Sequence, residues 1–146
     1  MRLSTGLRNA MLGTASFDAE FTACFINIYS GPQPASADDA ITGSNTLLAT
    51  IYSDGAALGL NFDAPVSGTI SKAAAETWSG TALASGTAAW FRLYEAGDTP
   101  ANLSTTASRV DGSIGISGGD MNISNTTITV SAVQTITQFD VTLPAS

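Results

Sequence analysis

The carboxylates are the side chains of this sequence with the widest chemical scope, because twelve Asp and Glu residues stand against five Lys and Arg and no histidine. Asp38 and Asp39 are the one adjacent pair, and adjacent carboxylates on a loop can share a hard cation such as calcium. The sequence lacks the Asp-x-Asp-x-Asp-Gly spacing of a calcium loop, so a solvated loop is the simpler interpretation. Glycosidases also need two converging carboxylates, and no pair here is placed to converge. We therefore predict no metal site and no enzyme.

The lack of histidine excludes the usual nucleophilic and zinc sites. A Ser-His-Asp or Cys-His arrangement cannot form within one chain, and one cysteine cannot supply the four ligands of a structural zinc site. A single cysteine also excludes a disulfide within the chain. Cys24 lies between Ala23 and Phe25 in an apolar stretch, which indicates a buried and unreactive thiol. We expect no cofactor.

Composition and charge narrow the class of partner. The formal net charge is −7 and 12% of the residues are charged, so the chain lacks the basic footprint of a nucleic-acid-binding protein. No apolar run approaches the roughly 20 residues of a membrane-spanning helix, and the first residues lack the apolar centre of a secretory signal. Hydrophobic residues make up 44% of the chain and the mean hydropathy is +0.20, which argues against disorder. These values favour one folded domain with a structural or binding role.

The first 13 residues predict a short helix. Ser4 or Thr5 can cap it at the N-terminus, and Gly13 ends the helical pattern. A helix of under three turns is not stable alone, so its apolar face must be covered. The chain's own sheet and a partner protein are both open as the covering surface. The apolar residues concerned are Leu3, Leu7 and Met11.

From residue 21 onward the pattern changes to short strands separated by Gly, Pro, Asn, Asp and Ser. By propensity, residues 73–76 favour a helix, but Trp78-Ser-Gly80 follows almost at once and makes extended structure more consistent. We predict an all-β fold, an antiparallel β-sandwich of jelly-roll type, with residues 1–13 as a short N-terminal helix or arm and residues 14–146 as a single domain. The predicted strands are 22–29, 46–52, 59–62, 67–71, 85–94, 109–116, 127–130 and 135–143.

The two tryptophans either fill the core or line a binding groove. In the predicted strand that ends at Tyr94, side chains alternate between the two faces of the sheet. Trp90 and Tyr94 share one face, while Phe91 and Leu93 share the other. Such a strand is central or covered on its outer side, so we predict that Trp78 and Trp90 belong to the core.

Seven stretches, mostly of turn and strand residues, carry a resemblance that runs through nearly the whole chain. They are residues 2–11, 28–37 (Ile-Tyr-Ser-Gly-Pro-Gln-Pro-Ala-Ser-Ala), 68–74, 78–80, 84–92 (Ala-Ser-Gly-Thr-Ala-Ala-Trp-Phe-Arg), 111–115 and 117–122. In these stretches the chain resembles a group of small structural proteins of tailed-phage virions. The resemblance implies a decoration or cement protein, made in the host cytoplasm, that binds the outside of the capsid and stabilises it. The major capsid protein and further copies of the chain, as a dimer or trimer, are the implied partners. A tail or neck protein, or a receptor-binding module, is the alternative.

The N-terminal segment is the contact surface that we expect for such a role. Two of the five basic residues lie within the first eight positions of a chain that is acidic overall. In this hypothesis the basic side chains meet acidic groups of the capsid, and the apolar ones bury area worth about 25 cal/mol per Å². The predicted partner-binding residues are Arg2, Leu3, Leu7, Arg8 and Met11.

Overall fold

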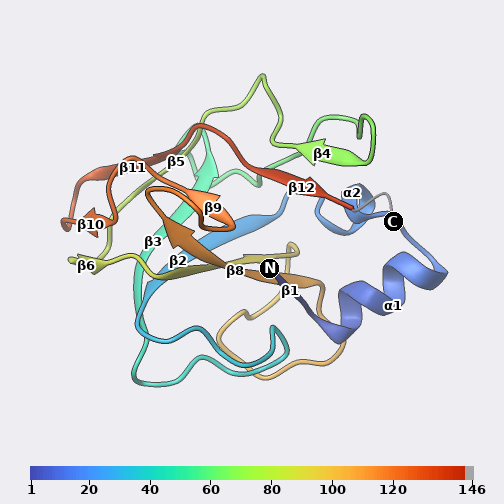
Figure 1. Cartoon of the computed structure of the whole chain (residues 1–146), viewed down its shortest axis with the longest axis horizontal. Coiled ribbons are helices and arrows are strands. Elements are labelled where there is room, and N and C mark those ends of the chain that lie inside the picture. The colour runs from blue at the N-terminus through green and yellow to red at the C-terminus, as the bar shows by residue number, and fades with distance from the viewer. Residues whose placement is uncertain (144–146) are drawn as a thin grey trace.

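Residues 1–143, which the computed structural model describes, form a chain that is mostly β with two short helices near its N-terminus (Figure 1). The helices are α1 (Thr5–Gly13) and α2 (Phe17–Glu20). The longer strands are β2 (Phe25–Ser30), β3 (Thr46–Ser53), β5 (Trp78–Thr81), β7 (Trp90–Tyr94), β8 (Arg109–Gly115) and β11 (Val133–Ile136). The shorter strands are β1 (Arg2–Leu3), β4 (Thr69–Ser71), β6 (Gly86–Thr87), β9 (Met121–Asn122), β10 (Thr127–Ile128) and β12 (Asp140–Thr142).

Eight strands form one large sheet in the order β1-β8-β7-β2-β3-β5-β11, with β9 added beside β8. Its pairings are antiparallel except that of β8 with β9. β6 with β10 and β4 with β12 form two separate two-stranded ribbons. The predicted all-β, antiparallel class and the short N-terminal helix are thus confirmed. A jelly-roll sandwich is not confirmed, because the described strands make one large sheet and two ribbons.

One face of the large sheet carries the hydrophobic core. Alternation along the strands directs Ile26 and Ile28 of β2, and likewise Phe91 and Leu93 of β7, to this face. Phe139, just before β12, packs edge-on against Phe91 with ring centroids 5.4 Å apart. The ribbons therefore cover the sheet on this side. Their own contributions to the core are Ile70 of β4, Ile128 of β10 and Val141 of β12.

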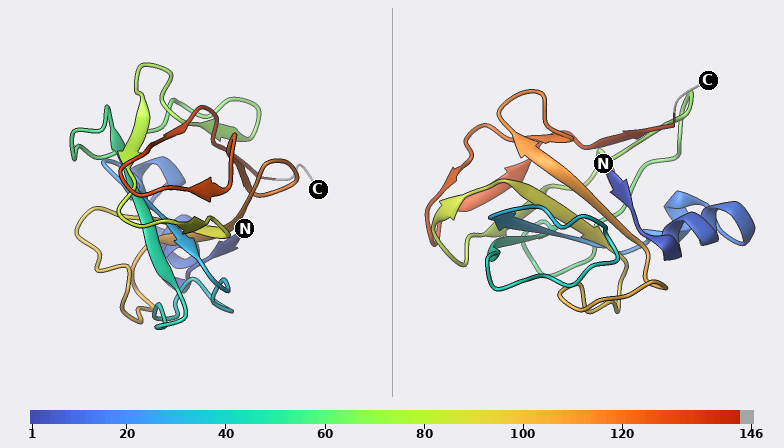
Figure 2. Two further views of the ribbon diagram at one scale, coloured as in Figure 1. Left: turned by 90° about the vertical axis from the view of Figure 1, so that its left-hand side faces the viewer. Right: turned by 60° about the horizontal axis from the view of Figure 1, so that its bottom comes forward.

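The opposite face of the sheet is polar and is covered by two long loops. Arg92 of β7 lies directly opposite Asp111 of β8, and the two fully buried side chains form a bidentate ion pair with both N–O distances at 2.7 Å. The same guanidinium donates to the carbonyl oxygens of Asp39 and Pro100, one in each loop. The right-hand view of Figure 2 brings these loops forward. The loops are residues 31–45 and 95–108.

Both tryptophans are fully buried, which confirms their assignment to the core. Trp78 packs against Phe139, and its indole N–H donates to a carboxylate oxygen of Glu76 at 2.9 Å. Trp90 lies on the polar face, where it stacks on Tyr29 with ring centroids 4.5 Å apart. β7 carries large side chains on both faces because the core covers one side and the loops cover the other.

The N-terminal segment is docked on the chain's own sheet, which resolves the two alternatives for its covering surface. β1 pairs with β8. The Ser4 hydroxyl accepts from the Leu7 N–H at 3.1 Å and donates to the Ala107 carbonyl at 2.7 Å, so one side chain caps α1 and ties it to a neighbouring loop. The approach at Gly6 is close, since a Cβ there would lie 2.2 Å from the Thr106 carbonyl oxygen.

Several local predictions differ from the structure. Residues 135–143, predicted as one strand, divide into β11, which pairs with β5, and β12, which pairs with β4. Residues 85–94, predicted as one strand, divide into β6 and β7 because the chain passes from the β6–β10 ribbon to the large sheet at Ala88 and Ala89. Residues 59–62 form isolated bridges, and residues 73–76 form a turn. The four residues of α2 are too few to show a helical period, so this helix was not predicted.

Candidate functional site

The predicted contact residues divide into buried and exposed ones. Leu7 is 0% exposed and belongs to the hydrophobic core, so the folded chain cannot offer it to a partner. This corrects the expectation that Leu7 binds a capsid. The reason is that α1 turns its Leu7 face to the sheet, where burial within the chain stabilises it. Leu3 and Met11 are partly buried and pack against the same core.

The remaining predicted contacts, Arg2 and Arg8, are exposed but lie on two different elements. Arg2 lies in β1, where it donates to the Pro34 carbonyl oxygen, and Arg8 lies on the exposed face of α1. The Arg8 side chain stays near its own helix, donating to the Ser4 carbonyl at 3.3 Å and to the Thr5 hydroxyl at 3.0 Å. Leu12 is 89% exposed, the largest exposed fraction among the large hydrophobic side chains of residues 1–143. The exposed face of α1 therefore carries one arginine and one large apolar side chain.

Asp38 and Asp39, the adjacent pair, each have a structural partner. Asp38 accepts from the Thr5 N–H at 2.8 Å and the Thr5 hydroxyl at 2.7 Å, at the start of α1. Asp39 accepts from the Ser36 N–H at 2.9 Å. Within residues 1–143, no group of three or more Cys, Asp or Glu side chains is arranged to hold a metal ion. The pair orders the loop beneath α1.

Protonation of Asp38 is expected to weaken the docking of α1. Desolvation acts to raise the pKa of this carboxyl, but the hydrogen bonds from Thr5 and the charge of Arg8 outweigh it, so the pKa lies below its ordinary value. A carboxyl with a lowered folded-state pKa stabilises the fold above its ordinary pKa, and this contribution is lost as the pH falls through the folded-state value.

The test is Asp38→Asn, followed by urea unfolding between about pH 6 and about pH 2. At the upper pH we expect a loss of about 1 kcal/mol, typical of a hydrogen-bonded carboxylate at a helix start. The difference from the wild type should shrink toward zero on acidification. A difference that is constant over the whole range would show that the charge of Asp38 has no part in it.

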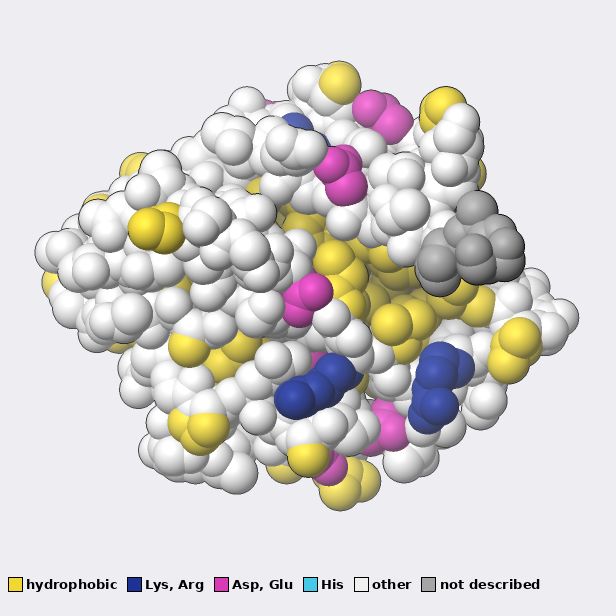
Figure 3. Space-filling model, in the orientation of Figure 1, with side chains coloured by type: hydrophobic (Ala, Val, Ile, Leu, Met, Phe, Trp, Pro, Cys, Tyr) yellow, Lys and Arg dark blue, Asp and Glu magenta, His cyan; other side chains and the backbone are white. Residues whose placement is uncertain are grey.

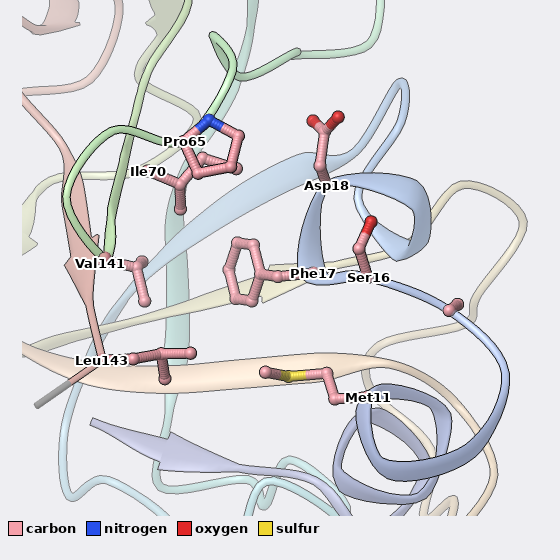
Figure 4. A pocket seen from close by; sticks show the side chains of 10 residues that line it. Met11, Ser16, Phe17, Asp18, Pro65, Ile70, Val141 and Leu143 are labelled. Atoms are coloured by element: carbon pink, nitrogen blue, oxygen red, sulfur yellow. The ribbon is translucent and has the colours of Figure 1, made fainter. Parts of the chain in front are cut away.

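An apolar groove lies beside these helices, between them and the β4–β12 ribbon. Figure 3 shows hydrophobic side chains gathered in this hollow on a surface that is otherwise largely uncharged and polar. The groove has a volume of about 340 Å³. In Figure 4, Phe17 points from α2 toward Ile70 and Val141, while Met11 points from α1 toward Leu143. Leu143 is 56% exposed, so the groove opens to solvent at that side.

A second, polar pocket of about 280 Å³ follows on the same segment of chain. Residues 137–140 line it on one side, and β9 with the preceding Asp120 lines it on the other. Val141 and Leu143 line the apolar groove. Residues 137–143 therefore border both hollows in succession, first the polar one and then the apolar one.

Asp18 gives the apolar groove a charged border. Within residues 1–143 its carboxylate has no hydrogen bond or ion pair, whereas each of the other eleven Asp and Glu side chains has at least one such partner. All five Lys and Arg side chains also have partners within the chain. Among the Asp and Glu side chains of residues 1–143, the unpaired one thus lies at the apolar groove.

Of the ten residues that line the apolar groove, the sequence singled out Met11 alone. Val141 and Leu143 lie in a stretch predicted to alternate polar and apolar residues, which is the signal that they share one face. Which apolar face stays open depends on how α2 and β12 are placed by the rest of the fold, and no local pattern contains that information.

Two further features of the described residues are the state of the single cysteine and the length of the helices. Burial raises the pKa of the Cys24 thiol well above its ordinary value, and the side chain is fully buried, which confirms the predicted buried thiol. Neither helix in residues 1–143 is long and apolar enough to cross a membrane.

Compared with known proteins, the chain matches no family model, no curated protein and no solved structure.

Proposed function

We propose that the chain is a structural protein of a tailed-phage particle, a decoration protein that binds the outside of the capsid through the apolar groove and the exposed face of α1. The open groove carries the proposal. The protomer exposes 7069 Å², close to the about 7000 Å² expected for a compact monomer of this mass. A chain that completes its own core and still leaves Met11, Phe17 and Leu143 around an opening is suited to bind a partner there.

The rest of the molecule fits a protein that acts by adhesion. The two arginines in the interior hold loops in place through hydrogen bonds to loop carbonyl groups. A net charge of −7 keeps copies apart at high local concentration. One groove contact is weak, but an oligomer that presents several grooves to the shell gains avidity. The resemblance to phage virion proteins supplies the class of partner.

The test adds the purified full-length chain to particles from a phage whose own copy of this gene is deleted, and measures occupancy by cryo-EM. Wild-type chain is expected to cover the shell in many copies. Leu143→Asp places a charge at the groove opening and should lower occupancy at least tenfold, which corresponds to about 1.4 kcal/mol. Leu103→Asp is the matched control, because Leu103 is 68% exposed and lies in the loop of residues 95–108, away from the groove.

Each outcome has a defined meaning. Equal occupancy for the two Asp variants would contradict attachment through the groove. Density confined to a ring at the neck or tail would contradict the capsid assignment and favour the tail or receptor-binding alternative. Circular dichroism and thermal unfolding of both variants establish that the proteins compared are folded.

A further inference from the structure

One edge of β12 has backbone groups that find no hydrogen-bond partner within residues 1–143. β12 pairs with β4 on one side, with Val141 opposite Ile70. The Leu143 N–H bonds to the Gly68 carbonyl, and the Lys72 N–H bonds to the Phe139 carbonyl, both at 2.9 Å. In an antiparallel pair, bonded positions alternate. The groups of 139, 141 and 143 therefore face β4, and those of Asp140 and Thr142 face away from it.

This edge belongs to the segment that borders the two hollows described above. Residues 137–140 line the polar pocket, and Val141 and Leu143 line the apolar groove. A partner segment of seven residues spans roughly 23 Å when it is fully extended. Within residues 1–143, no strand other than β4 pairs with β12. An exposed strand edge is a template for an added strand, whose backbone supplies affinity and whose alternate side chains enter pockets. An extended peptide can hydrogen-bond to the backbone groups of the edge and also place side chains in the apolar groove, whereas a compact ligand would fill only the groove.

The charges around the edge favour a basic occupant. Asp18 is unpaired at the apolar groove, and Asp140 lies on β12 itself with a neutral partner, Gln138, at 2.7 Å. A second copy of the chain is a poor occupant, because it carries a net charge of −7 and its five Lys and Arg side chains are already engaged. Two such copies would repel each other at this surface.

We propose that an extended segment of a partner protein adds as a strand to the outer edge of β12. Its alternate apolar side chains lie between Val141 and Leu143 on one side and Phe17 on the other, and a basic side chain pairs with Asp18. Under the proposed function, on which this inference rests for the partner's identity, the segment belongs to the capsid protein.

The first experiment uses the full chain and synthetic peptides of about nine residues, enough to span the groove. In one peptide valine and threonine alternate and one end carries lysine, and in the other glutamate replaces the lysine. Binding is measured by fluorescence anisotropy, and hydrogen exchange reports on the backbone N–H groups of Asp140 and Thr142. We expect the lysine peptide to bind at least tenfold more tightly and to protect both groups from exchange.

A pair of variants separates strand addition from side-chain contact. Thr142→Pro removes an N–H that faces away from β4, so the ribbon keeps its own hydrogen bonds. Thr142→Ala keeps that N–H, and both variants lose the 2.8 Å contact between the Thr142 and Thr69 hydroxyls. Peptide binding should fall at least tenfold for Thr142→Pro and stay within twofold of wild type for Thr142→Ala. Asp18→Lys should abolish the preference for the lysine peptide.

The outcomes distinguish this inference from the proposed function. Lack of peptide binding, or equal binding by the two Thr142 variants, would overturn strand addition. Dimerisation of the chain by itself in sedimentation, with protection of the same N–H groups, would make a second copy the occupant and also overturn the proposal. If Thr142→Pro still covers capsids like the wild type, strand addition fails while decoration stands. If peptides bind as expected but capsids stay bare, decoration fails while strand addition stands.

Discussion

Arg92→Ala is expected to lower the free energy of unfolding by about 3–5 kcal/mol, a large share of the stability of a domain of this size. Arg92 and its partner Asp111 are both fully buried, and they are joined by two hydrogen bonds of 2.7 Å. Removing the guanidinium leaves a buried carboxylate without its counterion. It also releases the carbonyl groups of Asp39 and Pro100, which anchor the two loops that cover this face of the sheet.

The pH dependence of this variant tests the cause. Burial acts to raise the pKa of Asp111, and the Arg92 guanidinium opposes that shift. Without the arginine, the folded-state pKa should rise further. A carboxyl with a raised folded-state pKa is stabilising when protonated, so the deficit of Arg92→Ala should shrink as the pH falls from about 7 to about 4. Urea unfolding at a series of pH values measures this.

Two control variants show whether the loss of stability comes from the uncompensated charge of Asp111. One removes an exposed arginine, and the other removes both charges of the buried pair. Arg8→Ala removes an exposed arginine of the same charge and should change stability by no more than about 0.5 kcal/mol. The double variant Arg92→Met with Asp111→Leu removes both charges, and replacement of a buried pair by apolar groups is often close to neutral. A double variant as unstable as Arg92→Ala would show that the ion pair itself, rather than an uncompensated charge, supports the fold.

Much of the sheet could be predicted because its central strands carry their own signal. β2 and β3 are rich in β-branched and aromatic residues between turn residues, and β8 carries Val110 and Ile114 at alternating spacing. The predicted strands at 22–29, 46–52 and 109–116 overlap these three strands. Burial of Arg92 and Arg109 could not be predicted, because charged residues are rarely buried unless paired. Their partners lie on a neighbouring strand or in a loop, at positions that depend on the tertiary fold.

The candidate site was partly predictable for a similar reason. A short helix with Met11 on its apolar side can be seen in the sequence, and Met11 does line the groove. Leu7 carries the same helical signal, yet it is buried. The spacing of residues places both on an apolar face, but it does not say where the covering surface ends. The alternation of residues 135–143 predicts a strand that includes β12, but it does not show which edge of that strand stays unpaired.

Leu7→Ala is the second change for which we expect a large effect, a loss of about 2–5 kcal/mol in the free energy of unfolding. Leu7 is 0% exposed and is a member of the hydrophobic core. Truncation would leave a cavity, and the close approach of Gly6 to Thr106 limits how far α1 can move to fill it. Leu12→Ala is the matched control, because Leu12 lies on the same helix at 89% exposure and should cost no more than about 0.5 kcal/mol.

The contrast between buried Leu7 and exposed Leu12 also determines how the role of α1 in binding must be tested. Since Leu7 supports the core, deleting residues 1–12 would destabilise the whole protein and would lower capsid occupancy whether or not the helix touches the shell. Leu12→Asp changes the exposed face of α1 and leaves the core intact. If this face binds the capsid, Leu12→Asp should lower occupancy at least tenfold without a change in the unfolding midpoint. Unchanged occupancy would restrict binding to the groove, and similar destabilisation by Leu7→Ala and Leu12→Ala would contradict the orientation of the helix.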